Sequence, residues 1–265
     1  MDVNHTFVIC AYKESEYLEE CILSLKKQEL QSFLIMETST PNEHISSLAE
    51  KYEIPLYINP HGGITQDWNF GLSKVKTKYA TIAHQDDVYE PGYGKRIVEA
   101  FEKSRKPLIA FSDYGEIRNG KKVTATRMLR VKRLMLLPLR IKAFQGSRFV
   151  RRFILSFGDP IACPAVSFQL ERLERPIFRN HFRSCEDWEA WELISRKDGE
   201  FLYVPEPLMY HRIHEESATT AVIRDKARVE ENYRMFCKFW PKTIAKQLNK
   251  LYTKSEAFNS LSEKV

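Results

Sequence analysis

The sequence predicts an α/β fold in which a mostly parallel central sheet is flanked by helices, with a basic helical insert and a C-terminal helix. Three observations predict this fold. Apolar segments of strand length alternate with helical spacing over residues 7–112, residues 118–152 are rich in cations, and apolar residues recur at helical spacing over residues 229–240. With 43% hydrophobic and 12% aromatic residues, the 265-residue chain has enough material for a packed core, which excludes an intrinsically disordered chain.

Strand-like and helix-like patterns follow one another in order along the first part of the chain. Each expected strand is a short apolar run bounded by polar residues, and each expected helix has apolar residues three or four positions apart. The strands cover residues 7–11, 33–36, 55–58, 79–83 and 107–112, and the helices centre on residues 18–25, 45–52, 68–75 and 97–101. This alternation favours right-handed crossovers between parallel strands, whose carboxyl ends then form the ligand site.

The basic insert is a separate feature of the sequence. Residues 118–152 contain 12 Lys or Arg and no Asp or Glu, which leaves 29 basic against 35 acidic residues elsewhere, a net charge of −6. Apolar residues such as Leu134, Phe149 and Phe153 interleave with the cations, a pattern typical of a segment that contacts an anionic membrane surface. The alternative is a helix whose apolar side belongs to the core and whose cations are solvated. Nucleic acid is disfavoured as a partner, because the insert has few aromatic residues suited to stacking and matches no binding module.

Several classes of protein are excluded by what the sequence lacks. No uncharged apolar run approaches the length that spans a bilayer, and residues 1–4 lack the basic start of a signal peptide. The five cysteines are widely spaced, odd in number and without a Cys-x-x-Cys pair, which argues against a zinc site or a disulfide framework. We therefore expect a protein of the reducing cytoplasm.

Polar residues collect where the predicted strands end. The first strand ends at Ala11 and Tyr12, the second at Glu37, and the fourth runs into Asp86 and Asp87. Adjacent carboxylates repel each other unless a cation lies beside them, and one or two carboxylates with substrate phosphates commonly hold Mg²⁺ or Mn²⁺. The position of the diacid after a buried strand favours such a site over a solvated turn and predicts nucleotide binding.

A second acid pair, Glu186 and Asp187, precedes a helix-like pattern. Carboxylates at a helix start are often caps, but these two are also candidates for a general base that activates an attacking hydroxyl. His211 and His214 follow later in the chain. We expect one of these histidines to reach the metal site, with a structural role as the alternative.

Four motifs together resemble family 2 glycosyltransferases of the GT-A (Rossmann-like) fold. Residues 8–22 are similar to the opening strand and helix of that family, and residues 79–91, which contain the sequence His-Gln-Asp-Asp, resemble its DXD region. Residues 186–189 resemble its ED motif and residues 205–214 its closing strand, so the resemblance extends over residues 7–220. It implies inverting transfer of a sugar from a nucleotide-sugar, with a divalent metal.

The resemblance also implies a role for each matching residue. Asp187 would be the catalytic base, with Glu186 as its neighbour or substitute, and Asp87 would bind Mn²⁺ or Mg²⁺ with His214 close to the metal. Asp86 would approach the ribose, and the other residues implied for nucleotide-sugar binding lie near the nucleobase. These residues are Ala11, Tyr12, Glu14 and Glu37.

The sequence departs from the family pattern at three places. His84 replaces the first acid of the DXD region, so metal binding is expected to depend on the two acids that follow. Met36 and Glu37 stand where the family usually has two acids, and Trp68 replaces an Arg of the third helix that could contact phosphate. UDP remains the expected nucleotide.

The predicted function is a metal-dependent, inverting glycosyltransferase that moves a hexosyl or related sugar from a UDP-sugar to a lipid-linked or growing cell-surface glycan. It would act in the cytoplasm, peripherally on the inner face of the cell membrane. Two alternatives stay open: a non-catalytic membrane adaptor that keeps the fold, and a nucleotidyltransferase, which needs a Gly-rich phosphate loop that residues 11–16 lack. The expected divisions are 1–117 (nucleotide-sugar half), 118–157 (insert), 158–220 (acceptor and base half) and 221–265 (C-terminal helical extension).

Overall fold

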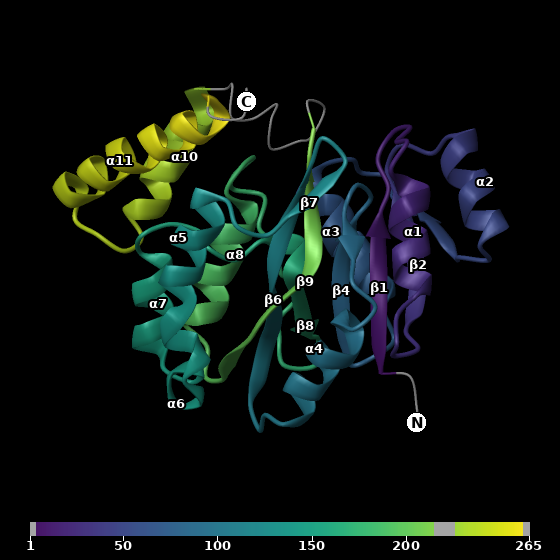
Figure 1. Cartoon of the computed structure of the whole chain (residues 1–265), viewed down its shortest axis with the longest axis horizontal. Coiled ribbons are helices and arrows are strands. Elements are labelled where there is room, and N and C mark those ends of the chain that lie inside the picture. Colours follow the sequence, from purple (N-terminus) through teal and green to yellow (C-terminus); the bar gives the residue numbers. More distant parts are fainter. Residues whose placement is uncertain (1–3, 215–225, 262–265) are drawn as a thin grey trace.

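One sheet runs through the middle of the molecule (Figure 1). A computed structural model describes residues 4–214 and 226–261. Within these residues the sheet has nine strands, in the order β3-β2-β1-β4-β8-β6-β9-β5 with β7 paired to β6. The strands are β1 (His5–Cys10), β2 (Phe33–Thr38), β3 (Leu56–Ile58), β4 (Tyr79–His84), β5 (Val88–Tyr89), β6 (Pro107–Arg118), β7 (Lys121–Val123), β8 (Val166–Gln169) and β9 (Glu200–Ile213).

The first half of the sheet is parallel and the second half is mixed. β1 pairs in parallel with β2 and β4, and β2 pairs in parallel with β3. β8 then runs antiparallel between β4 and β6, whereas β6 and β9 are parallel to each other. The predicted α/β fold is therefore confirmed, and β5, β7 and β8 are strands that the alternation of apolar segments did not predict.

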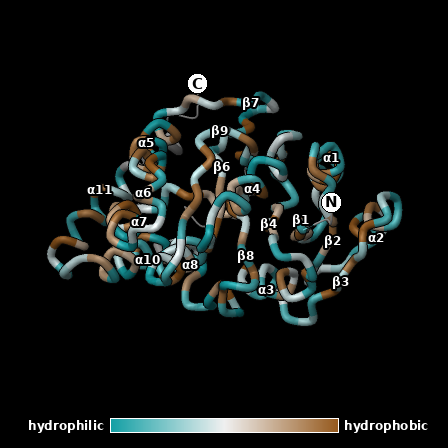
Figure 2. The backbone as a smooth tube through the Cα atoms, turned by 90° about the horizontal axis from the view of Figure 1, so that it is seen from below, coloured by the Kyte–Doolittle hydropathy of each residue, from teal (hydrophilic) through white to brown (hydrophobic). Residues whose placement is uncertain are grey.

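Helices cover both faces of the sheet, and Figure 2 shows α1 and α4 on one side of the strands and α3, α8 and α10 on the other. Successive residues of β1 enter different cores, Phe7 beneath α1 and α4 and Val8 beneath α3, because side chains alternate across a strand. The helices are α1 (Leu18–Lys26), α2 (Glu43–Lys51), α3 (Ile64–Lys74), α4 (Tyr93–Glu102), α5 (Arg127–Leu136), α6 (Lys142–Gln145), α7 (Arg148–Leu155), α8 (Glu186–Ser195), α10 (Lys226–Phe236) and α11 (Lys242–Leu261), with 3₁₀ turns η1 (Leu137–Arg140) and η2 (Cys163–Ala165).

The predicted basic insert folds as short helical segments, α5, η1, α6 and α7. Thr126 and Ser147 start α5 and α7, because their hydroxyls accept bonds from the backbone N–H groups of Leu129 (3.2 Å) and Val150 (3.3 Å). One side of the insert is core: Leu129, Leu136, Leu139, Ile154 and Leu155 are buried.

Several cations of the insert also hold the fold. Arg151 is buried and donates to the backbone carbonyls of three residues around the end of α8, Ser195, Lys197 and Gly199. Arg133 pairs with Asp113 on β6, and Arg152 pairs with the buried Glu192 on α8. These three arginines therefore fix the insert to β6 and to α8.

Two helices, α10 and α11, stand where the sequence predicted one C-terminal helix. α10 ends at Phe236, and Pro241, which has no N–H to donate, precedes α11. Phe236 is buried as expected, but Val229 is 41% exposed.

No helix in the described ranges is long and apolar enough to cross a bilayer. The expected division at 117 falls at the end of β6, and the one at 220 lies outside the described residues.

Candidate functional site

The carboxyl ends of β1, β2 and β4 meet as the parallel pairing predicts. The backbone N–H of buried Ala11 donates to the carbonyl of Glu37 (2.9 Å). The Gln85 side chain makes two hydrogen bonds with the backbone of Tyr12. Its amide oxygen accepts from the Tyr12 N–H at 2.9 Å, and its amide nitrogen donates to the Tyr12 carbonyl at 2.9 Å. The Tyr12 side chain remains half exposed beside these bonds, and Glu14 lies exposed on the loop that follows.

Strand β9 closes the site from the other side. Because β5 follows the diacid and pairs antiparallel with β9, Asp87 lies opposite the end of β9. Asp87 Oδ1 accepts from His211 Nδ1 (3.0 Å) and from the backbone N–H of Arg212 (3.0 Å). His214 Nε2 lies 2.9 Å from Asp86 Oδ2. The structure therefore brings both predicted histidines to the diacid.

These contacts set the protonation of the cluster. Burial alone would lower the pKa of His211, but the charge and hydrogen bond of Asp87 outweigh burial and raise this pKa to about 9. Burial alone would raise the pKa of Asp86, but the hydrogen bond with His214 and the nearby His211 and His84 outweigh it and lower that pKa. Asp86 is therefore ionised near neutral pH, and a protonated His211 lies against Asp87.

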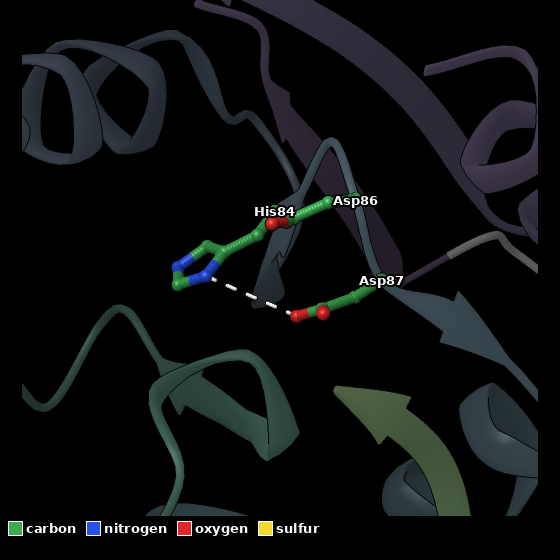
Figure 3. Close-up of side chains that lie close together, drawn as sticks. All are labelled: His84, Asp86 and Asp87. Carbon is green, nitrogen blue, oxygen red and sulfur yellow. Dashed lines mark ion pairs between the residues drawn. The ribbon is translucent and has the colours of Figure 1, made fainter. Parts of the chain in front are cut away.

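The chemistry of this cluster suits a divalent cation. His84, Asp86 and Asp87 each offer one ligand atom, and these atoms lie within 4.8 Å of one another. Figure 3 shows the imidazole of His84 facing Asp87, at 3.9 Å between Nδ1 and Oδ2. Asp87 Oδ2 is buried without a hydrogen-bond partner, so this oxygen has unused lone-pair capacity. Carboxylate oxygens are the ligands that Mg²⁺ and Mn²⁺ prefer.

His84 belongs to this cluster although it departs from the family pattern. Trp68 on α3 stacks on the His84 ring, with centroids 5.4 Å apart and planes 12° from parallel, and packs edge-on against Phe178. The Trp68 side chain thus fixes the ring plane of His84. The replacement that would remove a phosphate-binding Arg gives the metal cluster a positioned imidazole instead.

Glu37 is fully buried beneath α3. A Cβ at Gly71 of α3 would lie 3.0 Å from Glu37 Cγ, and neither carboxylate oxygen of Glu37 has a hydrogen-bond partner. Burial and, less strongly, the charge of the neighbouring Asp67 raise the pKa of Glu37 to about 8, against an opposing effect of the Cys10 thiol. Asp67 is itself fixed by Ser39 (2.8 Å) and Asn59 (2.8 Å). The residue expected beside the nucleobase is therefore a largely protonated acid in the floor of the site.

The second acid pair begins α8. Asp187 is half-buried, and its Oδ1 accepts from the Trp188 N–H at 2.8 Å. Glu186 is buried, and burial raises its pKa to about 7, with nearby Asp187 and Glu231 raising it and Arg228 lowering it. The charges that act on Glu186 thus come from Asp187 beside it and from Glu231 and Arg228 of α10. Asp187 is the more accessible of the two carboxylates.

A further carboxyl, Asp159, lies beside Asp187. Burial and the charge of Asp187 raise the pKa of Asp159 well above its ordinary value, and Lys132 from α5 opposes this rise. One oxygen of Asp159 accepts from the Ile161 N–H at 3.0 Å. Nothing in the sequence signals that residues on α5, on the loop that holds Asp159 and on α8 meet.

Carboxylates of both acid groups act on one buried thiol. Burial raises the pKa of Cys163 in η2 well above its ordinary value, and the charges of four carboxylates raise it further: Asp187, Asp159, Glu186 and Asp87. Members of both predicted acid pairs thus influence the same buried side chain.

Comparison with known sequences identifies the family. The profile of "Glycosyl transferase family 2" matches residues 6–164, more than half of the chain. The chain belongs to this family. It is also 23% identical over 281 aligned residues to an uncharacterized glycosyltransferase of Haemophilus influenzae, an alignment that spans 96% of this chain and 77% of that protein.

Solved glycosyltransferase structures share the fold. The structure of S. aureus TarS superposes with a TM-score of 0.61 at 12% identity, over 93% of this chain but 42% of TarS. The structure of TarS residues 1–349 in complex with UDP-GlcNAc superposes with a TM-score of 0.61 at 14% identity, over 93% of this chain and 70% of the TarS fragment. The structure of the mannosyltransferase PcManGT of Pyrobaculum calidifontis, in complex with GDP-Man and Mn²⁺, superposes with a TM-score of 0.62 at 13% identity, over 89% of this chain and 63% of PcManGT. The predicted GT-A fold is confirmed, and the chain is a glycosyltransferase.

Gln85 is expected to position Tyr12 for the donor. Gln85→Ala removes both bonds that hold the Tyr12 backbone, so we expect the KM for the nucleotide-sugar to rise about 10-fold while kcat changes little. Steady-state release of the nucleoside diphosphate measures both constants.

Two variants control this test. Gln85→Glu keeps the acceptor for the Tyr12 N–H but loses the donor and should give an intermediate KM. Gln28→Ala removes a similar pair of bonds, to Glu90 and Gly94, at the start of α4. An unchanged KM in Gln85→Ala, or an equal rise in Gln28→Ala, would contradict the positioning role.

The burial of Glu37 makes stability depend on pH. The folded chain keeps a proton up to about pH 8 that the unfolded chain releases near its ordinary pKa of 4.5, so the free energy of unfolding falls as pH rises between these values. Glu37→Gln removes this loss and should be about 2–4 kcal/mol more stable than the native chain at alkaline pH, but equal at acidic pH. Urea unfolding across this range measures the difference, and parallel curves for the two proteins would show that Glu37 is ionised in the folded state.

Proposed function

We propose that this glycosyltransferase moves a sugar from a UDP-sugar to a hydroxyl of a lipid-linked or growing cell-surface glycan, with inversion at the anomeric carbon. The observation that carries the proposal is the set of ligand atoms for a divalent cation that His84, Asp86 and Asp87 offer at the end of β4. The half-buried carboxylate of Asp187 supports it, because its charge and that of Asp87 both raise the pKa of the Cys163 thiol.

The donor is assigned to the side of the site formed by β1, β2 and β4. Tyr12, Ala11 and Glu37 would border the nucleobase, with Glu14 on the adjacent loop, and Asp86 would meet the ribose. UDP is the first nucleotide to test, because the fold is shared with a TarS fragment in complex with UDP and with UDP-GlcNAc. GDP is the second, because the fold is shared with PcManGT in complex with GDP-Man.

The metal is assigned to the cluster that ends β4. Asp87 Oδ2 is unpartnered there, His84 Nδ1 faces it, and Asp86 accepts a hydrogen bond from His214. Bound Mn²⁺ or Mg²⁺ would supply Lewis-acid stabilisation of the negative charge that develops on the leaving diphosphate. His211 and Arg212 hold Asp87 in place from β9.

Asp187 is assigned as the general base. It would take the proton of the acceptor hydroxyl as that oxygen bonds to the anomeric carbon and the bond from this carbon to the diphosphate breaks. One displacement of this kind inverts the configuration and needs a single carboxylate. The buried Glu186 faces charges of α10 and would support Asp187 rather than act on the acceptor. The alternative, an adaptor without turnover, would leave the metal cluster and Asp187 without a role.

Asp187→Asn tests the proposal directly. The amide keeps the shape of the side chain but cannot accept a proton, so kcat should fall by about 10²–10⁴ while donor binding stays close to native. Kinetics with an accepted donor and acceptor measure kcat, and calorimetric titration of UDP measures binding.

Glu186→Gln is the matched control, and it should retain much more activity than Asp187→Asn. Full activity of Asp187→Asn would exclude Asp187 as the base. Nuclear magnetic resonance of the product tests inversion in the same reaction, since a donor with an α-linked sugar should give a β linkage, and an α linkage would contradict a single displacement.

A further inference from the structure

We propose that the outward side of residues 127–157, here called the insert face, binds the surface of an anionic bilayer. The inference concerns where the enzyme works and adds to the proposed transfer reaction. It rests on exposed apolar residues, exposed cations and the position of this face beside the acceptor-side helix α8.

Exposed apolar side chains are concentrated on the insert face. Of the sixteen large apolar side chains exposed in the described parts of the chain, eight lie within residues 131–157. Phe149 is 77% exposed, Leu134 66%, Ile141 54% and Phe153 50%. A concentration of this kind marks an interaction surface, whereas single exposed apolar residues elsewhere need no explanation.

Helical geometry aligns these residues. On α5, exposed Arg130 and Val131 are adjacent, and each is three or four residues from exposed Arg127 and Leu134, so all four lie on one side of the helix. Phe149 and Phe153 follow one another on successive turns of α7, with ring centroids 6.0 Å apart. Both views place α5, α6 and α7 next to each other at the end of the molecule far from α2 (Figures 1 and 2).

The cations of the insert divide into two sets. Arg133, Arg151 and Arg152 point into the fold, where they pair with acids or backbone carbonyls. A second set is exposed to solvent on the same segment as the apolar residues: Arg127, Arg130, Arg140, Lys142 and Arg148. With no acid in residues 118–152 to offset them, these side chains give the insert face a positive charge.

The alternation of cations and apolar residues selects the partner. Arg130 adjoins Val131, Arg148 adjoins Phe149, and Ile141 stands between Arg140 and Lys142. Arg and aromatic residues are also common in protein interfaces, so the charge decides the partner: residues 118–152 contain twelve cations and no acid, which favours an anionic surface. The mixture suits the boundary of an anionic bilayer, where Phe and Leu enter the acyl region while Lys and Arg meet the headgroups, as on a cytoplasmic leaflet.

The insert face also lies next to the acceptor side of the site. α7 is joined to α8 by the Arg152–Glu192 ion pair and by the bond from Trp188 Nε1 to the Leu155 carbonyl (3.0 Å). α8 begins with the acid pair that includes Asp187. A bilayer at the insert face would therefore present a lipid-linked acceptor close to the proposed base.

Co-sedimentation with vesicles tests the proposal. The native chain should bind vesicles of phosphatidylcholine with phosphatidylglycerol and bind phosphatidylcholine vesicles much less. Arg130→Gln/Lys142→Gln/Arg148→Gln should weaken binding to the anionic vesicles by roughly 100-fold, since each cation contributes about fivefold. Phe149→Ser/Phe153→Ser should also weaken it, because it removes the side chains that enter the acyl region.

A matched variant separates the insert face from net charge. Lys27→Gln/Lys76→Gln/Arg172→Gln removes three exposed cations outside the insert and should bind like the native chain. Absent binding of the native chain, equal binding to both vesicles, or equal loss in this control would overturn the proposal. So would a dimer of the native chain that the Phe149→Ser/Phe153→Ser variant abolishes, because the face would then join two copies.

Calorimetric titration of UDP on the same proteins keeps the two proposals apart. All variants should bind UDP like the native chain, since none changes the donor site. A variant that loses vesicle binding but binds UDP like the native chain is changed at the insert face alone. Native vesicle binding without UDP binding would instead contradict the proposed donor.

Discussion

A fully buried carboxylate needs compensating donors, and Asp87 obtains them from a strand that begins far later in the sequence. His211, 124 residues further on, and the next backbone N–H both donate to one oxygen of Asp87. This contact exists only because β5 and β9 pair directly after the diacid. The second oxygen of Asp87 stays without a partner, next to His84 and Asp86, and provides the position for a cation. The donor half of the sheet and its closing strand are thus joined at one charged group.

The rest of the site extends outward from that group. Cys163 is close enough to Asp87 and Asp187 for both charges to raise its thiol pKa. The charges of Asp187 and of Lys132 in the insert both act on Asp159, so the basic segment contributes to the electrostatics around the proposed base as well as to an exposed surface. The buried and paired cations of the insert stabilise the fold, and its exposed cations lie beside exposed aromatic residues. The insert therefore contributes side chains to the core, to the surroundings of Asp159 and to the surface.

Local pattern and non-local contact explain how far the sequence could predict this structure. Apolar runs such as residues 7–11 and 79–83 predicted the parallel strands, and the diacid and the pair at 186–187 predicted the acid groups, because strand ends and helix starts are local features. The antiparallel insertion of β8 was not predictable from so short a run. The stacking of Trp68 on His84 and the approach of Asp159 to Asp187 depend on tertiary packing, as does the burial of Glu37 under Gly71. The composition of the insert suggested either a membrane surface or a packed helix; the structure shows which of its residues pack into the core, and the membrane contact stays a prediction.

We expect Asp87 to hold the metal that binds the donor diphosphate. Calorimetric titration of UDP with and without Mn²⁺, on the native chain and on Asp87→Asn, tests this role, with circular dichroism to verify folding. UDP should bind the native chain only with Mn²⁺, and this binding should be lost in the variant. Equal binding without the metal, or unchanged metal-dependent binding in a folded Asp87→Asn, would contradict it.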